Sequence, residues 1–205
     1  NADYTKRVVE DLERLAADEA VLVEAPPGAG KSSLTVSVTN ELTSRDRCLR
    51  LPIVTQTNEQ ADDLVATLRK RHPHITVARL IGSSSGPSTT MLALGGPGLV
   101  ISDDHDSPDV QDARVVVATA RKWEFVRSKQ QKAGNVRKYG LALIDEAYQM
   151  RSDALLGIAG LFEGLMCVGD PGQLDPFTTV DDSLWKGLEY SPSRTAMGTL
   201  RAYHP

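Results

Sequence analysis

A Gly- and Pro-rich loop between a strand pattern and a helix pattern constrains this chain more than any other feature. Ala20–Glu24 (AVLVE) has the composition of a short buried strand, and Ser32–Thr43 has that of a helix. Between them, Ala25–Ser32 reads APPGAGKS, the phosphate-loop pattern in the strand–loop–helix context that it requires. Ala25 replaces the first glycine of the strict pattern, which costs little if its backbone torsions are ordinary. The loop predicts a site for nucleotide phosphates.

Each residue type in this loop has a physical role. Gly28 and Gly30 allow unusual torsions, so that successive backbone N–H groups converge on the β- and γ-phosphates. The positive end of the following helix dipole lies at the same point. Lys31 supplies a charge to the phosphates, and the Ser32 hydroxyl is a ligand for Mg²⁺. The residues predicted to bind the nucleotide are Pro27, Gly28, Ala29, Gly30, Lys31, Ser32 and Ser33.

The remaining pattern alternates strands with helices, which predicts an α/β fold with a mostly parallel central sheet. Further strands are expected at Leu49–Thr55, Ile75–Ile81, Arg114–Thr119, Gly140–Asp145 and Leu165–Gly169, and further helices at residues 4–17 and Glu59–Arg71. One sheet can hold all of these strands, so residues 1–205 are predicted to form one domain. Residues 82–112 are rich in turn-forming residues and are expected to be a surface loop or a reduced insertion.

A second predicted site is acidic and follows a buried strand. Leu141–Ala147 (LALIDEA) places two adjacent acids after four apolar residues. A parallel strand that stops on Asp145 puts its carboxylate at the carboxyl edge of the sheet, beside the phosphate loop. We expect Asp145 to hold Mg²⁺, directly or through water, and Glu146 to orient and polarise the attacking water.

Composition excludes several classes of protein. The balance of 23 basic and 27 acidic residues rules out a wholly basic nucleic-acid coat protein, and 40% hydrophobic residues are normal for a globular core. Two distant cysteines exclude a disulfide scaffold and favour a reducing compartment. No apolar run approaches the ~18 residues of a membrane span, and no leader-like segment opens the chain. A cytoplasmic location without membrane contact is expected.

The segment Met166–Pro176 (MCVGDPGQLDP) is the most discriminating. Its strand ends in a Gly-Asp-Pro-Gly turn, which places Gln173 just beyond the sheet edge as a plausible sensor of the γ-phosphate. Together, APPGAGKS, LIDEAYQ and VGDPGQLDP resemble motifs I, II and III of superfamily 1 helicases, in the branch that includes the nonsense-mediated-decay helicases. LPIVTQTNEQADDLVATL at residues 51–68 looks like motif Ia of that family.

The resemblance implies an N-terminal RecA-like ATPase domain and assigns roles residue by residue. Lys31, Glu146 and Gln173 match catalytic positions, and Ser32 and Asp145 match the positions that hold Mg²⁺ beside ATP. Thr55, Thr57, Asn58 and Thr119 match segments that touch the backbone of a single strand. Arg201 lies one place early for the fourth motif and is a candidate γ-phosphate contact. The adenine-reading Gln of the family has no counterpart, because residues 1–24 contain no Gln.

A basic segment suggests where nucleic acid binds. Residues 121–138 hold seven basic residues and one acid, which indicates either a phosphate-binding strip or a solvated helix face. Arg121, Lys122, Arg127 and Lys129 are the predicted contacts. Trp123 and Phe125 either stack on bases or pack into the core.

The sequence therefore predicts an ATP-binding and hydrolysing motor domain that acts on single-stranded RNA or DNA. Such motors need a second RecA-like domain, so we expect one in the parent chain or in trans, and slow turnover by this chain alone. Two alternatives remain: a nucleoside-kinase-like phosphotransferase and a nucleotide-gated binding module. A GTPase is disfavoured because the chain has no Asn-Lys-x-Asp segment.

Overall fold

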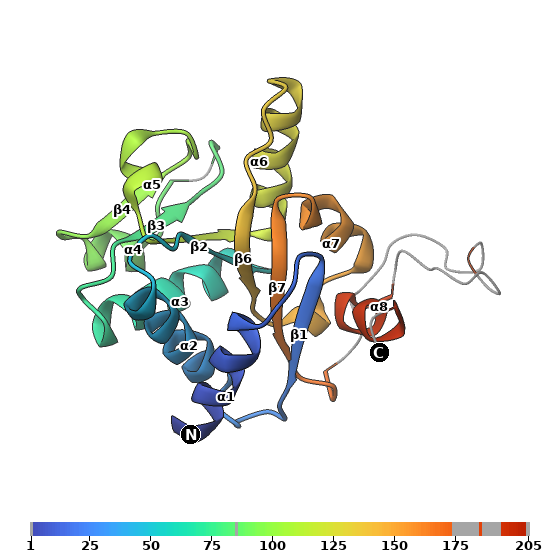
Figure 1. Cartoon of the computed structure of the whole chain (residues 1–205). Coiled ribbons are helices and arrows are strands. Elements are labelled where there is room, and N and C mark those ends of the chain that lie inside the picture. The colour runs from blue at the N-terminus through green and yellow to red at the C-terminus, as the bar shows by residue number, and fades with distance from the viewer. Residues whose placement is uncertain (1, 85, 174–184, 186–193, 204–205) are drawn as a thin grey trace.

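A seven-stranded sheet forms the centre of the fold in the computed structural model, which describes residues 2–84, 86–173, 185 and 194–203 (Figure 1). The strands are β1 (Glu19–Glu24), β2 (Leu51–Thr55), β3 (Val77–Leu80), β4 (Leu99–Ser102), β5 (Val115–Thr119), β6 (Tyr139–Ile144) and β7 (Phe162–Gly169). Their order is β1-β7-β6-β2-β5-β3-β4, and all neighbours pair in parallel. The carboxyl ends of the strands therefore meet at one edge, as predicted for an α/β fold with a parallel sheet.

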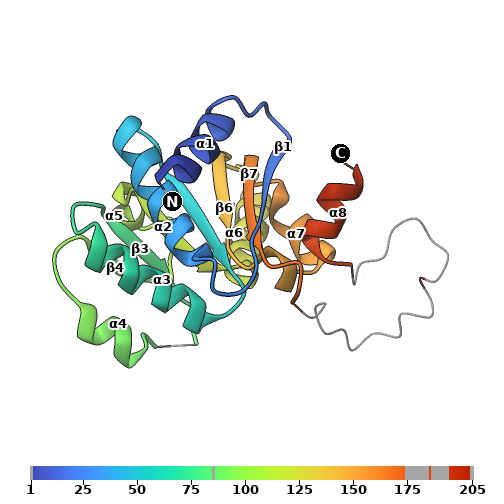
Figure 2. The same cartoon turned by 90° about the horizontal axis from the view of Figure 1, so that it is seen from below.

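Helices cover both faces of this sheet. One face packs against α1 (Ala2–Glu13), α2 (Lys31–Arg45), α3 (Asn58–Arg71) and α4 (Thr89–Leu94). The other packs against α5 (Pro108–Asp112), α6 (Ala120–Lys132), the 3₁₀ turn η1 (Ala147–Gln149), α7 (Ser152–Ala159) and α8 (Ala196–Tyr203). Figure 2 shows α8 beside α7, on the side of the sheet away from α2 and α3. None of the described helices is both long and apolar enough to cross a membrane.

The central strands supply apolar side chains to both layers of the core. In β2, Ile53 packs into the layer under α1–α4 and the next residue, Val54, packs into the opposite layer. Val116 and Val117 of β5 alternate in the same way. Successive side chains of a strand point to opposite faces, so a strand covered on both faces must be apolar throughout. This is why the continuous apolar runs in the sequence identified these strands.

Residues 82–112 differ from the expected surface loop. They contain α4, β4 and α5. β4 pairs in parallel with β3 and brings the number of strands in the sheet to seven. The strand is only four residues long, is half-buried, and is the outermost strand on one side of the sheet. Turn residues on both sides, Gly95–Gly98 and Asp103–Asp106, dominate the local composition and concealed it.

A buried aromatic cluster supports the sheet under α6. The Trp123 side chain is fully buried and its indole N–H donates to the carbonyl of Ile53 at 3.3 Å, so Trp123 belongs to the core. Edge-to-face contacts join Trp123 to Tyr139 and Phe162. His105, which is 4% exposed, completes the cluster and shares a 2.7 Å hydrogen bond with the Tyr139 hydroxyl.

This buried histidine predicts a dependence of stability on pH. Burial lowers the pKa of His105, and the neighbouring Asp106 opposes this only in part. Below pH 6.5 the unfolded chain binds a proton at this position that the folded chain does not, so stability is lost as pH falls from 6.5 through the folded pKa. We expect the free energy of unfolding in urea to decrease between pH 7 and pH 5, and to decrease less in His105→Gln. An equal decrease in both proteins would contradict the assignment.

Candidate nucleotide and nucleic-acid sites

The phosphate loop has the backbone geometry that anion binding requires. Gly28 and Gly30 have φ values of 74° and 85°, in the region that favours glycine. Ala25 is not among the described non-glycine residues with positive φ, so its replacement of the usual glycine is compatible with the loop. The Ala25 N–H donates to the carbonyl of Gly169 at 3.0 Å, and α2 begins at Lys31. The positive end of α2 therefore faces the loop.

Lys31 forms an ion pair with an acid that the sequence reasoning did not single out as a site residue. Its ammonium lies 3.6 Å from Asp170 Oδ2, and the two side chains are 9% and 2% exposed. Asp170 follows β7, and its Oδ1 accepts a 2.8 Å hydrogen bond from the N–H of Gly172. Oδ2 has no hydrogen-bond partner in the described part of the chain. The available signals were its position directly after a strand and its place in the Gly-Asp-Pro-Gly turn of the third motif.

Asp145 lies at the end of β6 next to the first turns of α2. The Thr35 hydroxyl donates to Asp145 Oδ1 at 3.3 Å, which joins the acidic strand end to the helix that carries Lys31. Burial, and secondarily the charge of Glu146, raise the pKa of Asp145 to about 6. A cation beside this desolvated carboxylate would offset both effects.

The oxygen donors here fit Mg²⁺ presented with a nucleotide. The Asp145 carboxylate and the exposed Ser32 hydroxyl of α2 are hard ligands of the kind that Mg²⁺ prefers. The described residues contain no group of three or more His, Cys, Asp or Glu arranged to hold a metal. Mg²⁺ commonly uses one or two protein oxygens and takes its other ligands from water and phosphates.

Glu146 and Gln173, predicted from separate motifs, are in contact. Gln173 Nε2 donates to Glu146 Oε2 at 3.0 Å. Glu146 has a φ of 52°, one of two positive values among the described non-glycine residues. This conformation costs on the order of 1 kcal/mol, and such strain concentrates at functional sites. Leu174–Pro176, the end of the third motif, lies outside the described residues.

Arg201 of α8 forms an ion pair with Glu24, the last residue of β1. The Tyr148 hydroxyl donates to the same carboxylate. The Tyr148 hydrogen bond, more than Arg201, lowers the pKa of Glu24. Arg201 therefore lies at the start of the phosphate loop.

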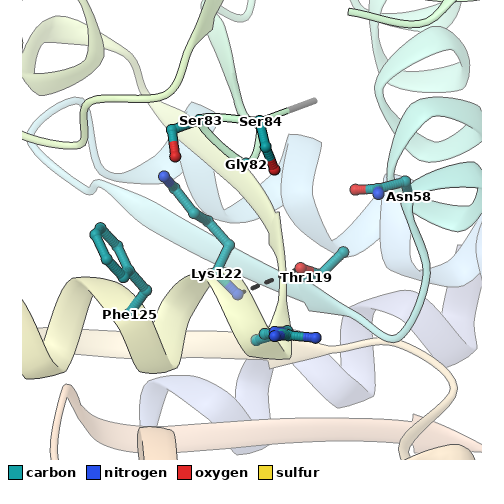
Figure 3. Close-up of a pocket in the computed structure, with 8 residues that line it drawn as sticks. Asn58, Gly82, Ser83, Ser84, Thr119, Lys122 and Phe125 are labelled. Carbon is teal, nitrogen blue, oxygen red and sulfur yellow. Dashed lines mark hydrogen bonds between the residues drawn. The ribbon is translucent and has the colours of Figure 1, made fainter. Parts of the chain in front are cut away.

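Apart from the phosphate-loop site, a cavity opens at the same edge of the sheet, beyond β2, β3 and β5. It is called the second cavity below. It measures about 410 Å³, and Figure 3 shows side chains around it from α3, the segment after β3, and α6. The lining residues are Asn58, Gly82, Ser83, Ser84, Thr119, Arg121, Lys122 and Phe125. Four of them were predicted to bind nucleic acid: Asn58, Thr119, Arg121 and Lys122. Sequence reasoning missed Ser83 and Ser84, whose hydroxyls gave no distinguishing signal.

Lys122 and Phe125 define one wall of this cavity. The Lys122 ammonium donates to the carbonyl of Asp103 at 2.7 Å and lies 5.1 Å from the centroid of the Phe125 ring. Burial lowers the pKa of Lys122. Phe125 is 60% exposed, so of the two aromatic residues on α6 only this one is free to stack on a base.

Asn58 is oriented by a buried ion pair. Arg79 of β3 is 1% exposed and binds Asp62 at 2.7 Å, and it also donates to Asn58 Oδ1 at 2.9 Å. Since a guanidinium only donates, the contact identifies the Asn58 oxygen and leaves the Asn58 NH₂ group as a donor for a ligand. The one sequence signal for this arrangement was an arginine inside a short strand.

The other predicted nucleic-acid contacts have partners within the protein. The buried Thr55 hydroxyl donates to the carbonyl of Thr57 at 3.1 Å. Arg127 donates to the carbonyls of Leu156 and Gly157 in α7, and Lys129 pairs with Asp104 and Asp106. The structure thus brings Arg121 and Lys122 to the cavity and engages Arg127 and Lys129 elsewhere.

Thr57 has a structural role that predicts a measurable loss of stability. Its hydroxyl accepts from the N–H of Gln60, and Gln60 Oε1 accepts from the N–H of Thr57, which is a complete capping box for α3. We expect Thr57→Ala to lower the free energy of unfolding by about 1 kcal/mol, and Thr57→Ser to retain most of it. Urea denaturation measures both. Equal losses in the two variants would contradict the capping role.

Comparison with known proteins identifies the family and the fold of the chain. A family model described as an AAA domain, AAA_19, matches residues 9–179. No curated protein matches the sequence. Among solved structures, a nuclease-deletion mutant of the Type ISP restriction-modification enzyme LlaGI, in complex with a DNA substrate mimic, aligns over 87% of this chain and 18% of its own, with 15% identity and a TM-score of 0.55.

Two further solved structures have similar folds. The Sulfolobus solfataricus SWI2/SNF2 ATPase core in complex with dsDNA aligns over 82% of this chain and 30% of its own, with 11% identity and a TM-score of 0.55. Arterivirus nonstructural protein 10, a helicase in complex with DNA, aligns over 82% and 33%, with 14% identity and a TM-score of 0.50. The chain spans a third or less of each, and the likeness is one of fold. With its RecA-like P-loop fold and a family match over most of its length, the chain belongs to the AAA_19 family of AAA domains.

Proposed function

We propose that this chain is the ATP-hydrolysing motor domain of a superfamily 1 helicase acting on single-stranded RNA or DNA. The observation that carries the proposal is the placement of two different sites on one sheet edge. The phosphate loop, Asp145 and Gln173 follow β1, β6 and β7, and the second cavity lies at the ends of β2, β3 and β5. A domain built this way can bind a nucleotide and a nucleic-acid strand side by side at the carboxyl ends of its parallel strands.

The residues of the first site supply the parts that phosphoryl transfer needs. The loop N–H groups and Lys31 bind the phosphates, while Ser32 and Asp145 would hold Mg²⁺. Bound Mg²⁺ supplies charge neutralisation of the phosphate oxygens. Glu146 orients and polarises the attacking water, and Gln173, already hydrogen-bonded to Glu146, senses the γ-phosphate.

The second cavity supplies donors for a nucleic-acid backbone. The Asn58 amide, the Ser83 and Ser84 hydroxyls and the cations Arg121 and Lys122 can all bind phosphate or sugar oxygens, and Phe125 offers a ring to one base. None of these contacts reads a base edge, so binding should be independent of sequence. The three helicase-like motifs support the superfamily 1 assignment, and a second RecA-like domain would complete the motor.

Binding of a fluorescent single strand tests the proposal. We expect log Kd to rise linearly with log salt concentration, and Lys122→Ala to weaken binding and to reduce the slope by about 0.7. Lys6→Ala, on the exposed face of α1, is the matched control and should leave the slope unchanged. Binding that is insensitive to salt, or equally affected by both substitutions, would count against a nucleic-acid site at this cavity.

A further inference from the structure

Three side-chain amides form a continuous hydrogen-bonded series that runs from the residues just before Asn58, which lines the second cavity, to Glu146 at the first site. Gln60 Nε2 donates to Gln149 Oε1 at 3.0 Å, and Gln149 Nε2 donates to Gln173 Oε1 at 3.4 Å. Gln173 Nε2 in turn donates to Glu146 Oε2 at 3.0 Å. Gln60 belongs to α3, Gln149 to the turn η1 after Glu146, and Gln173 to the turn after β7. The chain therefore crosses the sheet edge from the end of β2 to the catalytic glutamate.

The direction in which these hydrogen bonds donate is fixed at both ends of the series. At the start, Gln60 Oε1 accepts from the backbone N–H groups of Gln56 and Thr57, at 3.0 and 3.1 Å. At the finish, the Glu146 carboxylate can only accept. Each amide between these ends must use its oxygen toward α3 and its nitrogen toward Glu146, which settles the orientation of all three amides. Breaking either end of the series therefore removes a partner that orients the remaining amides.

We propose that Gln60 and Gln149 are positioning residues that couple nucleic-acid binding to the arrangement of Glu146 and Gln173. The inference rests on the proposed function. A strand phosphate that takes the N–H groups of Gln56 and Thr57 draws them away from Gln60, and a γ-phosphate that takes the Gln173 amide breaks the opposite end.

The sign of the coupling follows from this competition. Whichever ligand binds first bears the cost of disrupting this series of hydrogen bonds, and the second ligand meets a series that is already loosened. Binding of each ligand should therefore favour binding of the other, by the same factor in both directions. Gln149 is exposed, and it is the single side-chain link between α3 and the turn that carries Gln173 in this chain of contacts.

Gln60→Glu and Gln149→Leu each interrupt this series of side-chain hydrogen bonds at a defined bond. A glutamate at position 60 still accepts from the backbone N–H groups of Gln56 and Thr57 but has no N–H to give Gln149. Leucine at position 149 removes both of its bonds. Asn40→Asp, in the C-terminal half of α2, is the control for exchange of an amide for a carboxylate.

The measurement is the ratio of Kd values for a fluorescent poly-dT oligonucleotide without and with a saturating non-hydrolysable Mg·ATP analogue. We expect a ratio of about fivefold or more in the unaltered chain and in Asn40→Asp. Gln60→Glu and Gln149→Leu should each bring it below about twofold, and the double variant should lose no more than either single variant. The added charge of Gln60→Glu weakens strand binding with and without nucleotide and so cancels in the ratio.

The outcomes separate this inference from the proposed function. If the unaltered chain binds both ligands but its ratio is one, or if folded variants keep its ratio, the coupling role is wrong and the proposed function stands. If the unaltered protein fails to bind the oligonucleotide or the nucleotide analogue, the coupling role and the proposed function are both overturned. Thermal unfolding of each variant establishes that it is folded, and Gln149→Glu, which retains the bond from Gln60 and loses the one to Gln173, should behave as Gln149→Leu does.

Discussion

Replacing Lys31 with Met should both weaken nucleotide binding and destabilise the fold. Loss of the ammonium removes the charge-assisted contact that we propose it makes to the phosphates, which corresponds to about a 100-fold decrease in affinity. It also leaves Asp170, whose side chain is 2% exposed, as a buried charge without its partner. Removing one member of a buried pair typically costs about 3–5 kcal/mol, and we expect about 3 here because Lys31 retains some exposure.

The double variant Lys31→Met/Asp170→Asn separates these two effects. Asparagine removes the unpaired charge and keeps the oxygen that accepts from the Gly172 N–H. Urea denaturation should show most of the lost stability restored, while titration with a fluorescent ATP analogue should show binding as weak as in Lys31→Met. A double variant as unstable as the single one would mean that the ion pair is not what links Lys31 to stability.

Glu146→Gln should trap ATP. The substitution removes the carboxylate that we propose to polarise the attacking water, and general-base contributions of this kind amount to about 10²–10⁴ in rate. Binding should change little, because an amide oxygen can still accept from Gln173 Nε2. Under single-turnover conditions with excess protein, we expect hydrolysis to slow at least about 100-fold while bound ATP is retained on a filter.

Glu163→Gln is the matched control, since Glu163 lies exposed near the amino end of β7, at the opposite edge of the sheet. It should hydrolyse ATP as the unaltered chain does. Equal rates in Glu146→Gln and the unaltered chain would favour the alternative of a nucleotide-gated binding module.

The geometry of the candidate nucleotide site could largely be predicted because its determinants are local. The Gly28 and Gly30 torsions, the start of α2 at Lys31 and the placement of Asp145 at a strand end all follow from short segments whose residue types permit little else. The parallel sheet then follows from strands that are apolar throughout. Trp123 and Phe125 show where this reasoning stops, because one helix carries both and only packing decides which is buried.

The sequence by itself determined the fold class, the phosphate loop and the acids at the strand ends. Tertiary structure alone decided the contacts that depend on strand order. Because β7 lies between β1 and β6, Asp170 meets Lys31 and Gln173 meets Glu146, although each pair joins distant motifs. The contact between Gln60 and Gln149 arises in the same way, because β2 lies beside β6. The Arg79–Asp62 pair forms where α3 packs against β3. Such contacts combine one residue type from each of two segments, and neither segment carries a pattern that names its partner.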